Sequence, residues 1–351
     1  PSGLQADGGE CEGICFAAHL TLAFAVYKPV HQNAQTAEIC GKTVVLDIGI
    51  PEAVLYASLN GFAKVTKSSV QSWLPRRLPD THKGSYGRLL VIAGSCGMAG
   101  AAMMATLSAM RTGCGLTTLA APENVVKSAA PHLMEAMTLP LAENAEGTIV
   151  SEALRQIETA IIGKTAVLIG CGLRTSENTK QIVQYITKNT NSIVVLDADA
   201  LNSIAGDPSI LKGAKAQVVI TPHIGEMARL TGMTVEQVSS RQEEAARAFA
   251  CEYGCVTVLK SHRTVVAAPD GTLWINTTGN AALAKGGSGD VLAGMIASFA
   301  AQGLEAAAAA ICAVWVHGFA ADRLVRRMSQ YSVLARDLIG EIPFALKALG
   351  L

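Results

Sequence analysis

The stretch 88–102, RLLVIAGSCGMAGAA, decides the fold class. Residues 88–93 are a short apolar run, which predicts a buried strand, and glycine ends that run directly. Residues 100–112 are rich in alanine and methionine and predict a helix. A buried strand that passes through a glycine-rich turn into a helix is typical of an α/β protein. The glycine spacing is not GxGxxG, so the turn does not predict a dinucleotide-binding Rossmann fold.

The same alternation continues from this stretch toward the C-terminus. Further buried strands are expected at 116–120, 166–169, 193–196, 218–220, 256–260, 264–267 and 273–275. Helices are expected at 179–189, 239–253, 290–301, 305–321 and 333–349, and residues 268–271 read as a hairpin turn. The predicted fold class is therefore α/β, with a largely parallel central sheet that helices flank on both faces.

Composition excludes several classes of protein. In 351 residues, 28 lysines and arginines balance 28 aspartates and glutamates, and half of the residues are hydrophobic. A disordered chain needs low hydrophobicity and high net charge, and a nucleic-acid-binding protein needs an excess of basic residues. The most apolar stretch, 306–316, is shorter than the roughly 20 residues of a membrane-spanning helix. We therefore expect neither nucleic acid nor membrane as a partner.

Residues 1–66 differ from residues 67–351. The first segment holds two candidate strands, 19–26 and 43–48, and about 65 residues with two strands make a marginal independent core. It is expected to be a piece of something larger. The nine cysteines include no CxxC pair. They are interpreted as buried free thiols of a reducing cytosol, which predicts a cytoplasmic protein.

The strongest chemical signal is the stretch 285–294, KGGSGDVLAG. Three glycines let the backbone approach a ligand, and a helix is expected to start directly after them. A helix N-terminus offers unpaired N–H groups and partial positive charge to an anion. Asp290 lies at that terminus, where it could cap the helix or serve as a general base beside a bound phosphate.

Other candidate ligand-binding segments also follow predicted strands. In 221–226, TPHIGE, His223 and Glu226 would face a site at the carboxyl end of the sheet. The turn 170–173, GCGL, follows a strand in the same way. Residues 260–264 are either a phosphate contact or a solvated hairpin. In 197–202, DADALN, the two carboxylates could hold Mg²⁺ through water, or Asp199 could cap a helix.

Taken in order, these segments resemble the ADP/ATP-dependent NAD(P)H-hydrate dehydratase family, whose fold is ribokinase-like. The resemblance covers about residues 70–351. It rests on 82–88 (HKGSYGR), 94–102, 170–173, 195–202, 221–226, 278–280 (TGN) and 286–294. Residues 67–351 are accordingly expected to be a dehydratase domain.

The resemblance implies a hydro-lyase that repairs damaged NADH and NADPH. With Mg²⁺ and with ADP or ATP as phosphate donor, such an enzyme phosphorylates the C6 hydroxyl of the hydrates (S)-NADHX and (S)-NADPHX and then eliminates phosphate. Asp290 would be the base, and Ala101, Gly172, His223 and Asp290 would touch the hydrate. Glu226 would position Mg²⁺ through water. The nucleotide would contact Lys260, Ser261, His262, Arg263 and Thr264, together with Gly286, Gly287, Ser288 and Gly289.

The chain departs from the family pattern at three places. Ile224 replaces a proline, Ser261-His262 replaces Gly-Ala, and Arg174 replaces the last glycine of Gly-Leu-Gly. Residues 1–66, with the pattern DIGIP at 47–51, resemble the C-terminal end of the NAD(P)H-hydrate epimerase domain. The catalytic residues of that domain should lie upstream, so we expect no epimerase activity. Relatives form homo-oligomers, commonly tetramers.

Two other hypotheses stay open at this point. A small-molecule kinase of the same fold would release a stable phosphorylated product. A nucleotide-binding relative without turnover would bind ADP and catalyse nothing. The resemblance does not choose between ADP and ATP.

Overall fold

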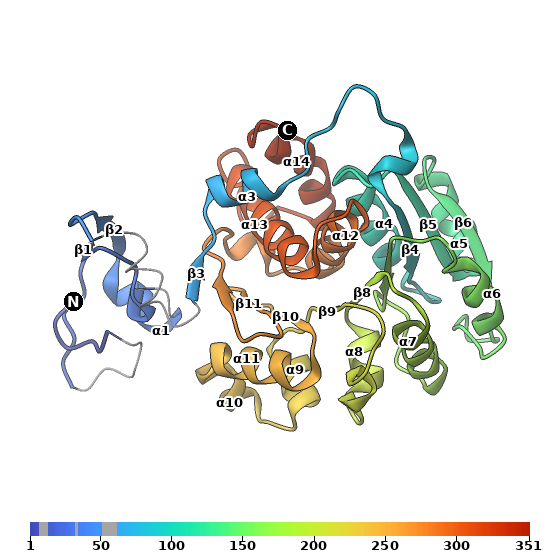
Figure 1. Ribbon diagram of the computed structural model, residues 1–351, viewed down its shortest axis with the longest axis horizontal. Coiled ribbons are helices and arrows are strands. Elements are labelled where there is room, and N and C mark those ends of the chain that lie inside the picture. The colour runs from blue at the N-terminus through green and yellow to red at the C-terminus, as the bar shows by residue number, and fades with distance from the viewer. Residues whose placement is uncertain (7–12, 32–33, 51–61) are drawn as a thin grey trace. The chain divides into compact units, whose positions relative to one another are not determined.

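The computed structural model describes residues 1–6, 13–31, 34–50 and 62–351 (Figure 1). It divides into two compact units, Pro1–Lys64 and Val65–Leu351. Of the residues discussed above, Pro51 lies outside the described residues.

The first unit contains a small parallel sheet. Strands β1 (Leu20–Phe24) and β2 (Lys42–Leu46) pair in parallel, and helix α1 (Ala34–Cys40) connects them. Strand β3 (Phe62–Lys64) ends the unit. Both predicted strands exist. The first is shorter than expected, the second starts one residue earlier and ends two residues earlier, and the helix between them was not predicted. Cys15 is disulfide-bonded, so the expectation of free thiols is wrong for that residue.

The second unit is built on one large sheet. Within it the strands follow the order β12-β11-β10-β9-β8-β7-β4-β5-β6. Neighbours from β10 to β6 are parallel, whereas β10–β11 and β11–β12 are antiparallel. The bounds are β4 (Arg88–Ile92), β5 (Leu116–Pro122), β6 (Met137–Leu141), β7 (Ala166–Ile169), β8 (Ile193–Leu196), β9 (Val218–Ile220), β10 (Val256–Leu259), β11 (Val265–Ala267) and β12 (Leu273–Ile275).

Helices cover both faces of this sheet, as Figure 1 shows. One layer comprises α3 (Lys67–Trp73), α4 (Ala99–Arg111), α12 (Ser288–Ala301), α13 (Ala306–Leu324) and α14 (Ala335–Lys347). The other includes α7 (Glu177–Asn189), α8 (Asp199–Ile204), α9 (Ile224–Thr231), α10 (Val235–Ser240) and α11 (Gln242–Tyr253). The remaining helices are α5 (Glu123–Ala129), next to α4, and α6 (Ala153–Ala160). The predicted three-layer α/β class is confirmed.

The central strands are short continuous apolar runs because both of their faces are covered. All residues of β7, β9 and β10 are buried, as expected for a parallel sheet between two helical layers. The predicted helix 239–253 is in fact two helices, which break at Arg241 (φ −135°, ψ 48°). Among the described residues, α13 alone is long and apolar enough to cross a membrane, and 72% of its most apolar window is buried inside the fold.

The HKGSYGR segment has a packing role far from the carboxyl ends of the strands. Gly87 has a φ of +86°, and a Cβ there would lie 2.0 Å from the carbonyl oxygen of Ala301 at the end of α12. A Cβ at Gly115 would lie 1.8 Å from the carbonyl oxygen of Lys83. These glycines let the segment pack directly against the backbone of β5 and α12.

Candidate active site

The candidate site forms where the parallel strands end. From β4, the chain adds β5 and then β6 toward one edge of the sheet. It then returns to β7, on the other side of β4, and continues through β8 and β9 to β10. Ligands in open α/β sheets bind at such a reversal, beyond the carboxyl ends of the strands. The segments that follow β4, β7, β8, β9 and β10 are the glycine turns and polar loops singled out in the sequence.

Three side chains from different segments meet at this edge. Cys171 follows β7, Asp197 follows β8, and Asp290 lies in the first turn of α12. One ligand atom from each lies within 4.8 Å of the others. Cys171 is fully buried and Asp197 is 2% exposed. Two carboxylates and a thiol therefore share a small, mostly buried volume.

Asp197 is held from three sides. Its Oδ1 accepts hydrogen bonds from Thr221 Oγ1 at 2.6 Å and from Lys260 Nζ at 2.8 Å. Cys171 Sγ donates to its Oδ2 at 3.6 Å. Burial lowers the pKa of Lys260, but the carboxylates of Asp197 and Glu226 outweigh burial and leave it above its usual value. Lys260 is therefore an ammonium ion, and it compensates the charge of Asp197.

Asp290 is the carboxyl group whose proton affinity the site changes most. Burial, followed by the nearby negative charge of Asp197, raises its pKa from 3.8 to about 6. Such a carboxylate is a stronger base than an exposed aspartate and is still mostly ionised at pH 7. Burial also raises the pKa of Cys171 well above its usual value, so that thiol remains protonated.

The beginning of α12 differs from the prediction by two residues. The helix starts at Ser288 rather than at Asp290, and Gly287 is its N-cap with a φ of +93°. Asp290 occupies the third helical position, and no side chain caps this terminus. The capping alternative for Asp290 is therefore wrong. Its carboxylate lies beside Cys171 and Asp197 instead.

His223 and Glu226 form a reciprocal cap at the start of α9. His223 Nδ1 accepts hydrogen bonds from the backbone N–H groups of Gly225 and Glu226 at 3.0 and 3.2 Å. Glu226 Oε2 accepts from the backbone N–H of His223 at 2.8 Å and lies 4.0 Å from Lys260 Nζ. Ile224, in place of the proline, is the first helical residue. The Glu226 carboxylate therefore lies behind His223 and Lys260, buried.

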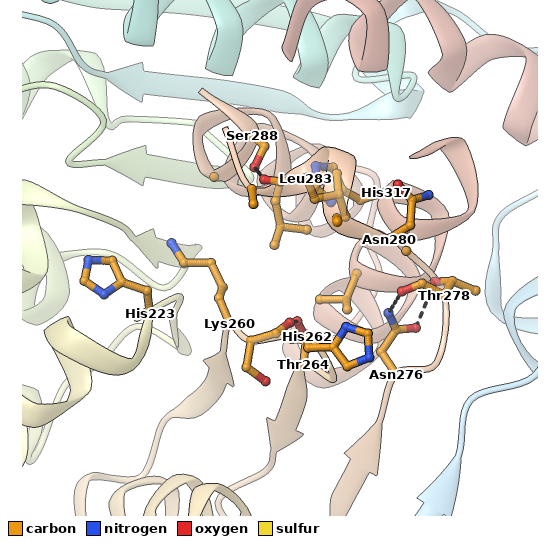
Figure 2. A pocket seen from close by; sticks show the side chains of 18 of the residues that line it. His223, Lys260, His262, Thr264, Asn276, Thr278, Asn280, Leu283, Ser288 and His317 are labelled. Atoms are coloured by element: carbon orange, nitrogen blue, oxygen red, sulfur yellow. Dashed lines mark hydrogen bonds between the residues drawn. The ribbon is translucent and has the colours of Figure 1, made fainter. Parts of the chain in front are cut away.

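A cleft of about 570 Å³ opens beside these groups (Figure 2). Several predicted nucleotide contacts line it, namely Lys260, Ser261, His262, Thr264, Ser288 and Gly289, and His223 lines it too. In Figure 2 the Lys260 side chain extends from the end of β10 toward His223. Arg263, Gly286 and Gly287 do not line the cleft, although they were assigned to the nucleotide.

The remaining wall of the cleft was given no role in the sequence analysis. It comes from the segment after β12, from α12 and from α13, and includes Asn276, Thr278, Asn280, Leu283, Leu292, Val314 and His317. Asn276 and Thr278 bond to each other (Figure 2). Thr278 Oγ1 also donates to the carbonyl of Trp315 at 2.9 Å. The short TGN pattern at 278–280 was the one sequence signal for this wall.

Asp322 of α13 fixes this wall from behind. Its carboxylate accepts hydrogen bonds from the backbone N–H of Gly279 at 3.0 Å and from Asn280 Nδ2 at 2.9 Å. His317, on the same helix, is 6% exposed, and burial lowers its pKa to about 4. It is therefore a neutral imidazole at physiological pH. Polar amides, a neutral imidazole and apolar side chains together make a wall suited to an organic ligand rather than to a bare ion.

Two other predicted substrate contacts lie side by side. A Cβ on Gly172 would lie 3.0 Å from Ala101 Cβ and 2.9 Å from Met98 Cβ, so the β4 and β7 turns touch here. Arg174 adopts a φ of +64°, and its backbone N–H donates to Asp199 Oδ2 at 2.8 Å. Its guanidinium donates to the carbonyl of Cys96 at 3.3 Å, so Arg174 links these same two turns.

Known proteins resemble this chain over most of its length. A family model described as NAD(P)H-hydrate dehydratase matches residues 89–344. A bifunctional NAD(P)H-hydrate repair enzyme of Moorella thermoacetica is 39% identical over 99% of this chain and 66% of its own length. The chain thus spans just under two thirds of that relative.

Solved structures also match. An ADP/ATP-dependent NAD(P)H-hydrate dehydratase from Bacillus subtilis, co-crystallised with ATP and Mg²⁺, is 34% identical, with a TM-score of 0.71 over 81% of this chain and 97% of its own. A ribokinase-like superfamily protein of Enterococcus faecalis is 26% identical, with a TM-score of 0.72 over 82% of this chain and 96% of its own. This chain therefore belongs to the NAD(P)H-hydrate dehydratase family and has its ribokinase-like fold.

Proposed function

We propose that this chain dehydrates NAD(P)H hydrates, with ADP or ATP as phosphate donor. The observation that carries the proposal is the position of Asp290. It is a half-buried carboxylate with a raised pKa, it occupies the first turn of a 14-residue helix, and its neighbour Gly289 lines a cleft of ligand size. A base next to an anion-binding helix terminus suits transfer of phosphate to a hydroxyl group.

The proposed reaction has two steps. Asp290 accepts the proton of the C6 hydroxyl while that oxygen bonds to the terminal phosphorus of the nucleotide and the bond from phosphorus to the leaving oxygen breaks. The phosphate ester then loses phosphate, which departs with the C–O bonding pair. Loss of a ring proton restores the 5,6 double bond. Net, the hydrate loses water and the nucleotide loses one phosphate.

The nucleotide is assigned to the cleft. The first-turn N–H groups of α12 have no acceptor within the helix and would bind the transferred phosphate, with Gly289 at the lining. Lys260 would contribute positive charge, and Ser261, His262 and Thr264 would contact the rest of the nucleotide. Arg263, Gly286 and Gly287 would act through the shape of their segments, since they do not line the cleft.

The hydrate is assigned to the neighbouring turns. Ala101 and Gly172 are in contact distance of each other, and Asp290 lies beside Cys171, the residue before Gly172. His223 is 54% exposed at its side chain and lines the nucleotide cleft, so it would touch both ligands where they meet.

A magnesium ion fits the donor set near Glu226. This buried carboxylate keeps free acceptor capacity after its bonds to His223, and it lies directly behind the cleft lining. Glu226 would hold Mg²⁺ through water, as oxygen ligands suit this ion. When bound, Mg²⁺ would neutralise phosphate charge in the transfer step.

Residues 1–66 we assign to the C-terminal part of an epimerase domain. Bifunctional repair enzymes match the chain over almost all of its length, including this segment. The assembly is proposed to be a homo-oligomer, a tetramer by resemblance, and the location cytoplasmic.

The Asp290→Asn variant tests the base assignment. Turnover should fall at least about 100-fold, since general base catalysis contributes roughly that much or more, while nucleotide affinity measured by calorimetry stays within a few-fold. Unchanged turnover would remove Asp290 from the mechanism. Accumulation of a phosphorylated product with an alcohol substrate would instead support a small-molecule kinase. Nucleotide binding with no chemistry on any substrate would support a non-catalytic relative.

A further inference from the structure

Lys260 lies between the nucleotide cleft and the proposed base. It lines the cleft, and a Cβ placed on Gly289 would be 3.5 Å from its Nζ. The same ammonium donates to Asp197 Oδ1 at 2.8 Å. Asp197 in turn has a carboxylate oxygen within 4.8 Å of Asp290. One lysine thus contacts both the nucleotide side and the carboxylate cluster.

The protein holds the Asp197 side chain in one position more strictly than the Lys260 side chain. It follows β8 directly, its side chain is 2% exposed, and Thr221 and Cys171 also donate to it. The next residue, Ala198, has a φ of +48°, a costly conformation for a residue with a Cβ. A four-carbon lysine side chain has many rotamers, so a fixed carboxylate is needed to keep its ammonium in one place.

We propose that Asp197 is a positioning residue, which holds the Lys260 ammonium in the wall between the nucleotide cleft and Asp290. The inference rests on the proposed function, because it assumes that Asp290 is the base and that the cleft takes the nucleotide. In the proposed arrangement, Asp197 touches neither ligand. It acts through Lys260 and through its own charge next to Asp290.

The pair makes opposite electrostatic contributions to Asp290. The groups that face Asp290 are Cys171 from β7, Asp197 and Asp199 from the β8 turn, and Lys260 from β10. Asp197 and Asp199 raise the pKa of Asp290, while Lys260 and the Cys171 thiol lower it. Removal of Asp197 charge should therefore make Asp290 a weaker base, and removal of Lys260 charge should make it a stronger one.

The first test is the pH dependence of kcat. In the Asp197→Asn variant the acid limb should move to lower pH, by about one unit, because a neighbouring charge typically changes a carboxyl pKa by that order. In Lys260→Met the same limb should move to higher pH. Asp199→Asn is the matched control, since it removes a carboxylate from the same turn that has no bond to Lys260. It should move the limb less than Asp197→Asn does.

The second test needs no turnover. If ionisation of Asp290 destabilises the folded protein, the Asp290→Asn variant should have a higher thermal unfolding midpoint than the parent at pH 8 but not at pH 4. This gain should shrink by at least half in the Asp197→Asn background and should grow in the Lys260→Met background. The two variants change the charge in opposite senses, so a general loss of stability cannot reproduce both results.

Nucleotide affinity provides the third readout. Lys260→Met should weaken ADP binding about tenfold or more, as expected for a lost charge-assisted hydrogen bond, and Lys260→Arg should restore part of it. The proposal would be overturned if neither Asp197→Asn nor Lys260→Met shifted the acid limb of the kcat profile or changed the stability gain from Asp290→Asn. Stability gains that move as described without any dehydratase turnover would instead uphold the positioning and refute the proposed function.

Discussion

At the scale of single residues, the Asp290 side chain is expected to reduce the stability of the folded protein. An aspartate that ionises at about pH 6 in the folded protein and near 3.8 in the unfolded chain is destabilising whenever it is charged. The cost is fully present above pH 6, it diminishes as the pH falls through 6, and it is absent below 3.8. A carboxylate retained at such a position is expected to serve catalysis rather than stability.

The Asp290→Asn variant should therefore be more stable than the parent at pH 8. We expect a gain in the free energy of unfolding of about 2 kcal/mol, below the full linkage value because the side chain is only partly buried. The gain should vanish near pH 4. Urea unfolding at both pH values measures it. An equal effect at both pH values would contradict the raised pKa.

The sequence predicted where the candidate site residues lie better than it predicted their contacts. Asp290, His223, Glu226 and Lys260 all lie at the carboxyl edge of the sheet, because each follows a recognisable strand or begins a helix. The hydrogen bonds of Lys260 to Asp197 and of Asp322 to the 278–280 turn join residues 42 to 63 positions apart. No local pattern encodes such pairs, so the wall formed by α13 was missed.

At the scale of elements, the crossing of α4 and α12 keeps the site in place. Gly294 lies at this crossing, and a Cβ there would be 2.1 Å from Ser108 Oγ and 2.2 Å from the carbonyl of Ala105. Ser298 Oγ also donates to the carbonyl of Ala109 at 2.8 Å. Helix α4 begins directly after the β4 loop, and α12 begins directly after the glycine segment. Their close approach therefore fixes one side of the site.

Gly294→Ala should destabilise the protein by about 2 kcal/mol or more. The added methyl group would collide with the Ala105 backbone, which cannot move aside as a side chain can. Gly340→Ala is the matched control within α14. That glycine is exposed, and a Cβ there meets nothing within 4 Å. Its replacement should stabilise by about 0.5–1 kcal/mol through helix propensity. Thermal unfolding of both variants measures these effects. A Gly294→Ala variant as stable as the parent would refute the close approach of the two helices.

Elements were predicted well where burial is continuous and poorly where it is not. Strands β7, β8, β9 and β12 have the predicted bounds, since short apolar runs between turns have few other interpretations. Edge strand β6 was missed because it is largely exposed and contains Pro140. The break at Arg241 was missed because no glycine or proline marks it.

At the scale of the whole molecule, the chain divides into two compact units. Val65–Leu351 contains the large sheet and every residue of the candidate site. Pro1–Lys64 contains a two-stranded parallel sheet whose Leu20, Leu22 and Phe24 side chains are more than half exposed. Parallel sheets are ordinarily covered on both faces, so this exposure agrees with the proposal that the unit belongs to an epimerase domain.

A chain limited to residues 65–351 should therefore keep the fold and the chemistry. We expect its unfolding midpoint within a few degrees of that of the full chain, and its kcat within about threefold. Circular dichroism and a steady-state assay, each run beside the 351-residue protein, measure both. Loss of the cooperative transition on truncation would show that residues 1–64 complete the second unit.

The central claim is tested most directly by the near-ultraviolet absorbance of NADH hydrate incubated with the protein, Mg²⁺ and either ADP or ATP. The dihydronicotinamide chromophore returns only when water is eliminated. We predict recovery that requires nucleotide, is lost in Asp290→Asn, and is faster with the true phosphate donor. No recovery with either nucleotide, in a protein shown by calorimetry to bind ADP, would contradict the assignment of this chain as a dehydratase.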